Sequence, residues 1–151
     1  MKSPAILLAG LLCLGAAMPA LATSVAPKPL QDMVAEADQI VRATVVAVEM
    51  VDGRGRPLTD PEAPTGPGVS NEIRLVLQVQ DVLRSPGKVP GTIRVPLWTM
   101  WHDSLGRARG AYLHSEGIFL LKSERHAPVY PMDFQRPLVE RARIQALMGA
   151  P

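Results

Sequence analysis

Two segments of this chain alternate apolar and polar residues, and the alternation constrains the fold more than any other feature. They are NEIRLVLQVQDVL, residues 71–83, and TIRVPLW, residues 92–98. The apolar side chains that share one face are Ile73, Leu75, Leu77 and Val79 in the first segment and Ile93, Val95 and Leu97 in the second. The intervening SPGKVPG is typical of a turn, so we predict two strands with one face in a core. Pro96 lacks an N–H, which places the second strand at a sheet edge or a bulge.

Three more segments are predicted to be extended. Residues 40–51 are dense in β-branched side chains, 117–123 form a short apolar run, and 127–133 give a last extended piece. In the second of these, Phe119 and Leu121 are expected to point inward because they share one face of the strand.

Helices are predicted at both ends of this strand-rich region. Residues 29–39 open with a proline and space their apolar residues for an amphipathic helix. Residues 137–149 start with Pro137, continue in good helix formers and end at Gly149. The predicted fold is therefore mainly β: a small OB-like barrel of about five strands, partly closed, with a short N-terminal and a C-terminal helix.

Two stretches are predicted to be loops. Residues 52–70 contain four prolines and four glycines, which interrupt any regular period, so this segment is expected to be a long mobile loop. Its alternative role is a partner-binding loop on the rim of the barrel. Residues 100–110 also lack a strand pattern and are predicted to form a loop.

The first 22 residues have the layout of a secretory signal peptide. Lys2 supplies the positive charge, residues 5–18 an apolar run shorter than the ~20 residues of a membrane-spanning helix, and Ala20-Leu21-Ala22 a cleavage site. Cleavage would leave residues 23–151 as a single domain without stable membrane insertion. The richness in Ala, Pro, Gly and Arg favours a bacterial source, so the expected location is periplasmic or extracellular.

Cleavage would also remove Cys13, the one cysteine of the chain. The domain could then hold neither a disulfide nor a thiolate metal site, and its stability must come from a core. The formal charge falls from +2 to +1 with the loss of Lys2. This near-neutral charge without a polybasic run argues against nucleic acid as a partner.

The pattern LQDMVAEADQIVRATVVAVE, a long loop, NEIRLVLQVQDVLRSPG, TIRVPLW and HSEGIFLLK resembles a group of small secreted bacterial proteins with an OB-like barrel. The resemblance extends to domains of the netrin and tissue-inhibitor-of-metalloproteinase type (NTR-like) and covers roughly residues 29–124. It concerns packing positions, so it implies a fold and a habit of binding partners. The animal inhibitors place an N-terminal cysteine on the catalytic zinc; the predicted mature chain has no cysteine, so that mechanism is not carried over.

Residues 96–110 hold both tryptophans of the chain and a pair of arginines between glycines. If the strand continues, Trp98 faces away from the core and Trp101 towards it. We therefore expect at least one ring to be exposed or to cover an open end of the barrel, as tryptophan does at binding hot spots. Arg107 and Arg109 would lie on the same side of an extended segment and could pair with carboxylates or sulfated sugars. The alternative is that both rings cap the core and the arginines are merely solvated.

Chemical motifs are sparse. Neither the G-x-S-x-G motif of serine hydrolases nor the H-E-x-x-H zinc motif occurs. His102 and His114 could form a metal site only if the fold joined them to Asp103 or Glu116, and Glu116 and Asp133 could act as acid and base only if they met in a pocket. Neither a metal nor another cofactor is therefore expected.

The sequence predicts a secreted, non-enzymatic domain that binds another macromolecule through the rim of its barrel. The preferred partner is a protein, with a secreted or envelope protease as one candidate. The competing function is a glycan-binding module that uses Trp98, Trp101 and the arginine pair. A metal carrier or metal-dependent enzyme is a third class and requires His102 and His114 to share a site.

Overall fold

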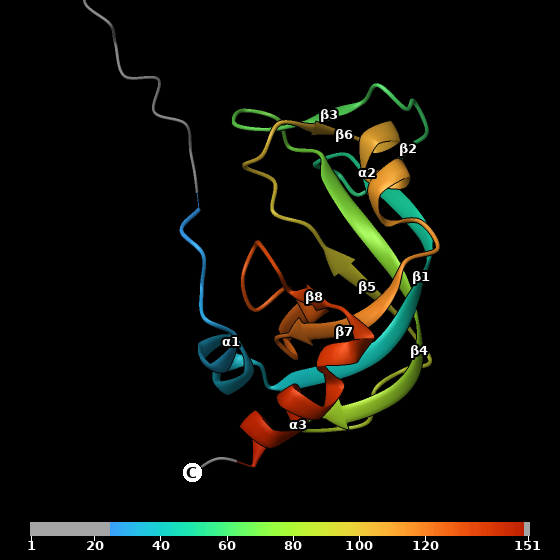
Figure 1. The fold of residues 1–151 in the computed structure, drawn as a ribbon. Coiled ribbons are helices and arrows are strands. Elements are labelled where there is room, and N and C mark those ends of the chain that lie inside the picture. Colours follow the sequence, from blue (N-terminus) through green and yellow to red (C-terminus); the bar gives the residue numbers. More distant parts are fainter. Residues whose placement is uncertain (1–24, 150–151) are drawn as a thin grey trace, which may run out of the picture.

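Two long antiparallel strands, β1 (Gln39–Val51) and β4 (Glu72–Arg84), form the centre of the fold in a computed structural model that describes residues 25–149 (Figure 1). The predicted signal peptide lies outside the described residues. The other strands are β2 (Pro57–Leu58), β3 (Pro64–Thr65), β5 (Thr92–Pro96), β6 (Asp103–Ser104), β7 (Glu116–Leu121) and β8 (Gln135–Arg136). The helices are α1 (Leu30–Glu36), α2 (Leu105–Tyr112) and α3 (Arg141–Met148), and the 3₁₀ turns are η1 (Glu124–His126) and η2 (Leu138–Glu140).

The main sheet has six strands in the order β5-β4-β1-β7-β8, with β2 paired to the end of β1. A second, two-stranded sheet pairs β3 with β6. All of these pairings are antiparallel. As Pro96 requires, β5 lies at an edge, where its missing N–H interrupts no ladder.

The sheet is strongly bent because its two longest strands do not pair in continuous register. The β1–β4 ladder shifts at three places, between Ile40 and Val41, between Arg42 and Ala43, and between Val45 and Ala47. Each extra residue increases the local twist and bends the strand. Val46, which the last shift leaves without a partner on β4, is 46% exposed. The result is a concave sheet whose open side carries the loops and whose lower end carries α1 and α3 (Figure 1).

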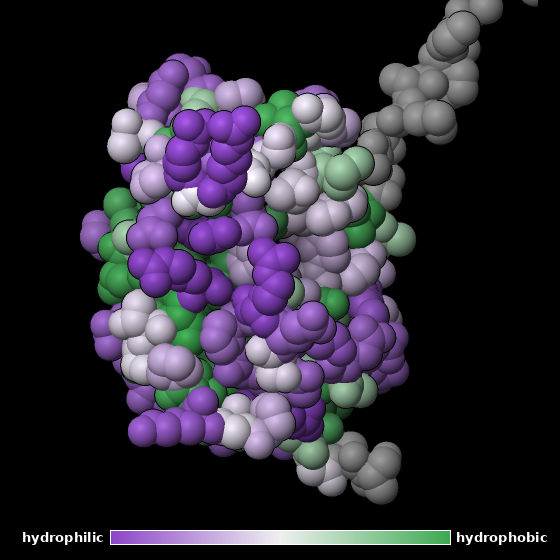
Figure 2. Space-filling model, turned by 180° about the vertical axis from the view of Figure 1, so that it is seen from behind, coloured by the Kyte–Doolittle hydropathy of each residue, from purple (hydrophilic) through white to green (hydrophobic). Residues whose placement is uncertain are grey.

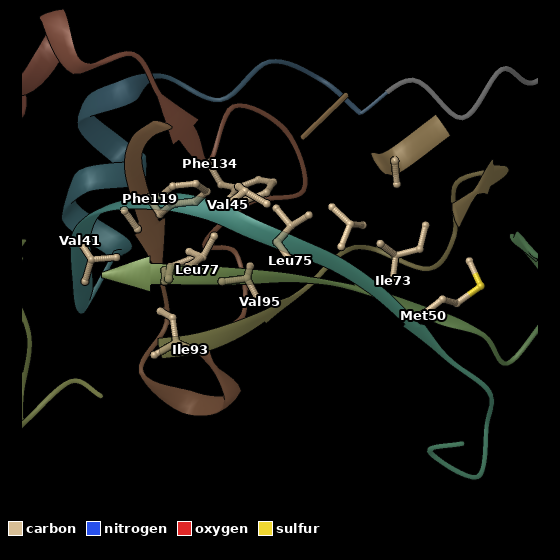
Figure 3. Close-up of a cluster of buried hydrophobic side chains, with 14 of the residues drawn as sticks. Val41, Val45, Met50, Ile73, Leu75, Leu77, Ile93, Val95, Phe119 and Phe134 are labelled. Atoms are coloured by element: carbon tan, nitrogen blue, oxygen red, sulfur yellow. The ribbon is translucent and has the colours of Figure 1, made fainter. Parts of the chain in front are cut away.

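The concave face carries the main core. Figure 3 shows labelled side chains from β1, β4 and β5 in a row along the bent sheet, with Phe119 and Phe134 beside them. Ile73, Leu75, Leu77, Ile93 and Val95 are all buried there, which confirms the faces predicted from alternation. Phe119 and Leu121 point into the same core, also as predicted.

A smaller core lies on the other face of β7. Ile118 and Leu120 alternate with Phe119 and Leu121, and they pack against α1 and Ile144 of α3. Because β7 is buried on both faces, its residues form a continuous apolar run rather than an alternating one. The N- and C-terminal helices, both predicted from the sequence, supply the cover for this second face.

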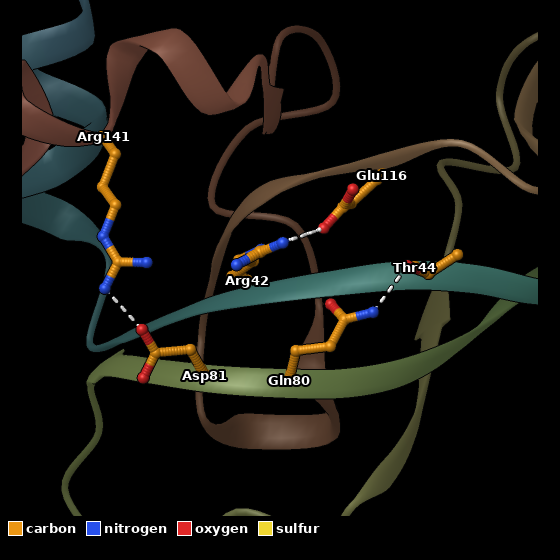
Figure 4. Close-up of polar contacts among 6 residues, drawn as sticks. All are labelled: Arg42, Thr44, Gln80, Asp81, Glu116 and Arg141. Carbon is orange, nitrogen blue, oxygen red and sulfur yellow. Dashed lines mark hydrogen bonds and ion pairs between the residues drawn. The ribbon is translucent and has the colours of Figure 1, made fainter.

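The outer face of β1 and β4 is polar. Figure 4 shows Arg42 paired with Glu116, Gln80 bonded to Thr44, and Arg141 of α3 paired with Asp81. Seen from behind, hydrophilic side chains cover the middle of the molecule (Figure 2).

The mainly β fold with its flanking helices is confirmed, but the sheet does not close. Between residues 25 and 149 no ladder joins β5 to β8; instead η1 lies against β5. The predicted last strand at 127–133 is also displaced, since β8 occupies Gln135–Arg136 and only Pro128 forms an isolated bridge, to Leu121. The segment 52–70, predicted to be a mobile loop, contains β2 and β3, each paired to another strand.

Gly117 is required by close approach of the neighbouring strand. A Cβ at this position would lie 2.8 Å from the carbonyl oxygen of Arg136 and 2.9 Å from Cγ of Gln135. Since a backbone atom cannot yield as a flexible side chain does, Gly117→Ala is expected to lower the free energy of unfolding by about 1–3 kcal/mol. Urea unfolding measures this. The control is Gly87→Ala, where the new Cβ meets no atom within 4 Å; equal stability of the two variants would contradict the strand packing described above.

Candidate functional site

Both tryptophans lie in the segment 97–102, which connects β5 to β6 along the concave side of the sheet (Figure 1). Pro96 ends the ladder, and the N–H of Leu97 donates to the carbonyl of Ile73 at 2.8 Å as the chain leaves the sheet. Further on, the Thr65 hydroxyl donates to the carbonyl of Trp101 at 2.8 Å. The segment is therefore held at both ends, on β4 and on β3.

The two indole rings contact each other edge to face. Their centroids are 5.2 Å apart and their planes are inclined by 77°. Trp98 and Trp101 are both half-buried. The structure thus gives neither a fully buried pair nor two open rings: each ring packs on one side and faces a hollow on the other.

These hollows join into a groove, here called the aromatic groove. One part is lined by Glu72, Pro96, Leu97, Trp98, Thr99, Ala127, Pro128 and Pro131. Another is lined by Trp101, Tyr112, Pro131, Met132, Asp133, Phe134 and Gln135. A small cavity between them is lined by Thr65, Ile73, Leu97, Trp98, Trp101, Asp103, Tyr112 and Pro131. Pro131 lines all three, so the hollows are adjacent, and most of the residues that line them are apolar.

The segment that carries Arg107 and Arg109 is helical, which corrects the prediction of a loop at 100–110. Ser104 caps α2, its hydroxyl accepting the N–H of Arg107 at 3.4 Å, and Leu105 and Ala108 are buried one turn apart. Positions two apart on a helix do not face the same way, so the arginines are not a pair.

The two arginine side chains accordingly have different surroundings. Arg107 is exposed and its guanidinium lies 3.6 Å from the carboxylate of Asp103 in β6, whereas Arg109 donates to the carbonyl of Val48 at 3.3 Å. Neither lines the aromatic groove. The predicted role of both in binding a partner finds no support in this geometry.

Sequence reasoning missed most of the groove. Tyr112 comes from α2, and Pro128 and Pro131 come from the connection between η1 and β8, far from the tryptophans in sequence. No local pattern marks these residues, because only the curvature of the sheet brings them to the tryptophans.

Burial raises the pKa of the Tyr112 phenol above its ordinary value of 10.0, and the negative charge of Asp103 raises it further. Tyr112 should therefore remain protonated at a pH where a free tyrosine is half ionised. Ultraviolet titration measures this in a Tyr130→Phe background, which leaves Tyr112 as the only tyrosine. Asp103→Asn should move the pKa back only in part, because burial is the larger cause. An unchanged pKa in Asp103→Asn would show that the carboxylate does not act on this end of the groove.

The other predicted chemical residues are dispersed. His102 is exposed and its ring packs over Gly66. A Cβ added at Gly66 would lie only 2.6 Å from Nδ1 of His102. His114 is exposed in the turn before β7 with a positive φ of 66°. Glu116 pairs with Arg42 at 2.6 Å on the outer face, whereas Asp133 lines the groove. Within residues 25–149 no group of three or more His, Cys, Asp or Glu side chains is placed to hold a metal ion.

No helix within residues 25–149 is long and apolar enough to span a membrane. A scan against models of known protein families finds no match to this chain, and a search of curated proteins finds no significant match.

Proposed function

We propose that this chain is a secreted, non-enzymatic binding domain that holds a segment of a protein partner in the aromatic groove. The observation that carries the proposal is the groove itself: two half-buried tryptophans beside three prolines, held between two loops. Half-buried indoles offer a large rigid apolar area at little entropic cost, which is the usual composition of a binding hot spot. Secretion rests on residues 1–22 of the sequence.

The inclination of the rings favours a peptide over a glycan. Sugars stack on the flat faces of aromatic rings, and a platform for consecutive sugars needs coplanar exposed rings. At 77° the two indole planes are far from coplanar, so they cannot form one flat platform for consecutive sugars. An apolar side chain of a protein needs only a pocket and suits this arrangement.

We also propose that the sheet is an OB-like barrel with one open seam. A bent antiparallel sheet with three register shifts, whose edge strand β5 faces η1 without a ladder, fits an OB-like barrel that is left open at one seam. The aromatic groove lies along this seam, between Pro96 and Pro128. The proposal includes the resemblance to NTR-like domains, whose habit of binding partners this chain would share without their cysteine-based mechanism.

The test is a peptide selection from a random-peptide phage library on the immobilised domain of residues 23–151, run beside a glycan array. Each selected peptide is then titrated while the tryptophan emission is recorded. Both tryptophans of the chain lie in the groove, so a change in emission reports binding there. The proposal expects peptides that bind and change the emission. Binding of glycans alone, or peptides that leave the emission unchanged, would contradict it.

A further inference from the structure

A cluster of arginines continues the aromatic groove at one end. A hollow lined by Glu72, Arg74, Arg94, Pro96 and Arg125 shares Glu72 and Pro96 with the part of the groove that Trp98 lines. The strands explain the placement. Arg94 and Pro96 alternate with the buried Ile93 and Val95, and Arg74 lies opposite Pro96 in the β4–β5 ladder. These residues therefore share the face of the sheet edge that is turned away from the core.

The arginines of this cluster are only partly neutralised. A single carboxylate, Glu72, serves two of them, Arg74 at 2.6 Å and Arg125 at 3.2 Å. Arg94 pairs with Glu49 at 3.0 Å. Three guanidinium groups thus face two carboxylates, and each guanidinium carries five N–H donors.

Two of the three arginines remain accessible to a ligand. The side chains of Arg94 and Arg125 are 57% and 67% exposed, whereas Glu72 is only 20% exposed. The cluster therefore presents positive charge and N–H donors to the solvent, while the shared carboxylate of Glu72 is less exposed.

The opposite end of the groove carries the opposite charge. Asp133 lines the part formed by Trp101 and Tyr112, and Asp103, which lies 3.6 Å from Arg107, lines the small cavity beside them. A ligand that lies along the groove would meet positive charge beside Pro96 and negative charge beside Trp101. Charge arranged in this way sets the direction of a bound segment as well as its affinity.

We infer that the groove recognises an acidic peptide segment in which a bulky apolar residue stands next to a carboxylate. The apolar side chain packs against Trp98 and Pro128, and the carboxylate accepts hydrogen bonds from Arg94 and Arg125. Planar guanidinium groups match a carboxylate with two parallel bonds, which makes this end the selective one. The inference rests on the proposed function and adds to it the chemistry of the partner.

The experiment uses the tightest peptide from the selection described above. It is synthesised as selected and with every Asp and Glu replaced by Asn and Gln, and both forms are titrated by calorimetry against the domain. The acidic form is expected to bind about tenfold more tightly, with an advantage that shrinks as salt is added. In the double variant Arg94→Gln/Arg125→Gln the two forms should bind alike. Arg54→Gln, an exposed arginine in the turn between β1 and β2, is the matched control and should keep the difference.

The outcomes separate the two proposals. If peptides bind and change the tryptophan emission but show no acidic preference, or if the preference survives in the double variant, the groove binds peptides and the inferred chemistry is wrong. If no peptide changes the emission, the proposed function itself fails and the acidic specificity fails with it. Both arginines are exposed, so the double variant should unfold at nearly the same temperature as the wild type. Thermal unfolding checks this, and it distinguishes a loss of the acidic preference from a loss of folding.

Discussion

Replacing Phe119 by alanine is expected to lower the free energy of unfolding by about 3–5 kcal/mol, the largest effect of any single change considered for this chain. Phe119 is fully buried on β7, and its ring lies 6.2 Å from that of Phe134. The two rings fill the concave face where the chain crosses from β7 to β8. Removing one ring leaves a cavity that strands held by ladders on both sides cannot close.

Denaturant unfolding followed by circular dichroism measures this loss. The control is Val139→Ala, because Val139 is an apolar residue that is 87% exposed and should change stability by no more than about 0.5 kcal/mol. Phe119→Leu, which keeps most of the volume, should recover most of the stability. Equal stability of Phe119→Ala and Val139→Ala would mean that the described core is wrong.

Replacing Trp98 by alanine is expected to weaken binding of a selected peptide by at least about 2 kcal/mol, or about 30-fold. Trp98 lines both the open part of the groove and the small cavity beneath it, so its ring forms the floor against which a ligand packs. Because the ring is half-buried at the edge of the core, its removal should leave the fold intact.

Calorimetry on wild type and variant gives the affinity, and thermal unfolding checks the fold. Met100→Ala is the matched control: Met100 is an apolar residue of the same segment, 47% exposed, which does not line the groove. It should bind the peptide as the wild type does. A similar loss of affinity in both variants would indicate a general effect on the segment 97–102. An unchanged affinity in Trp98→Ala would show that the Trp98 ring is not part of the binding site.

Strands β4 and β5 could be predicted because each has a buried face and a more exposed one. Arg74 and Gln78 alternate with buried neighbours on β4, and this period of two is visible in the sequence. The terminal helices could be predicted from Pro29 and Pro137 and from their apolar spacing. The bends of the sheet could not be predicted from the sequence, because the register shifts in the β1–β4 ladder depend on how two strands that are distant in sequence pair with each other.

Helix α2 was missed because glycines obscure it. Gly106 stands in its first turn, where a Cβ would lie 3.1 Å from the carbonyl oxygen of Pro61. This glycine is thus explained by the close approach of the chain between β2 and β3. The helix signals that remain, the Ser104 cap and the spacing of Leu105 and Ala108, are short and carry little weight without the tertiary contact.

Of the candidate site, only the tryptophans could be predicted from the sequence, because rare large aromatic residues stand out by type. The exposed arginines of the inferred carboxylate site, Arg94 and Arg125, are 31 positions apart and are brought together only when η1 lies against β5. Arg107 and Arg109 were predicted to act as a pair because only one residue separates them in the sequence. Side chains two positions apart on a helix point in different directions, whereas side chains from segments that lie side by side can meet even when they are distant in sequence.

The most direct test of the binding groove is fluorine NMR on the domain labelled with fluorotryptophan. The chain contains two tryptophans, so the spectrum should show two resonances, assigned by Trp98→Phe and Trp101→Phe. Addition of a peptide whose binding calorimetry has shown should shift the Trp98 resonance strongly. The Trp101 resonance should shift as well, because its ring contacts that of Trp98 edge to face. If the peptide binds and both resonances stay in place, the ligand lies elsewhere and the aromatic groove is not the binding site.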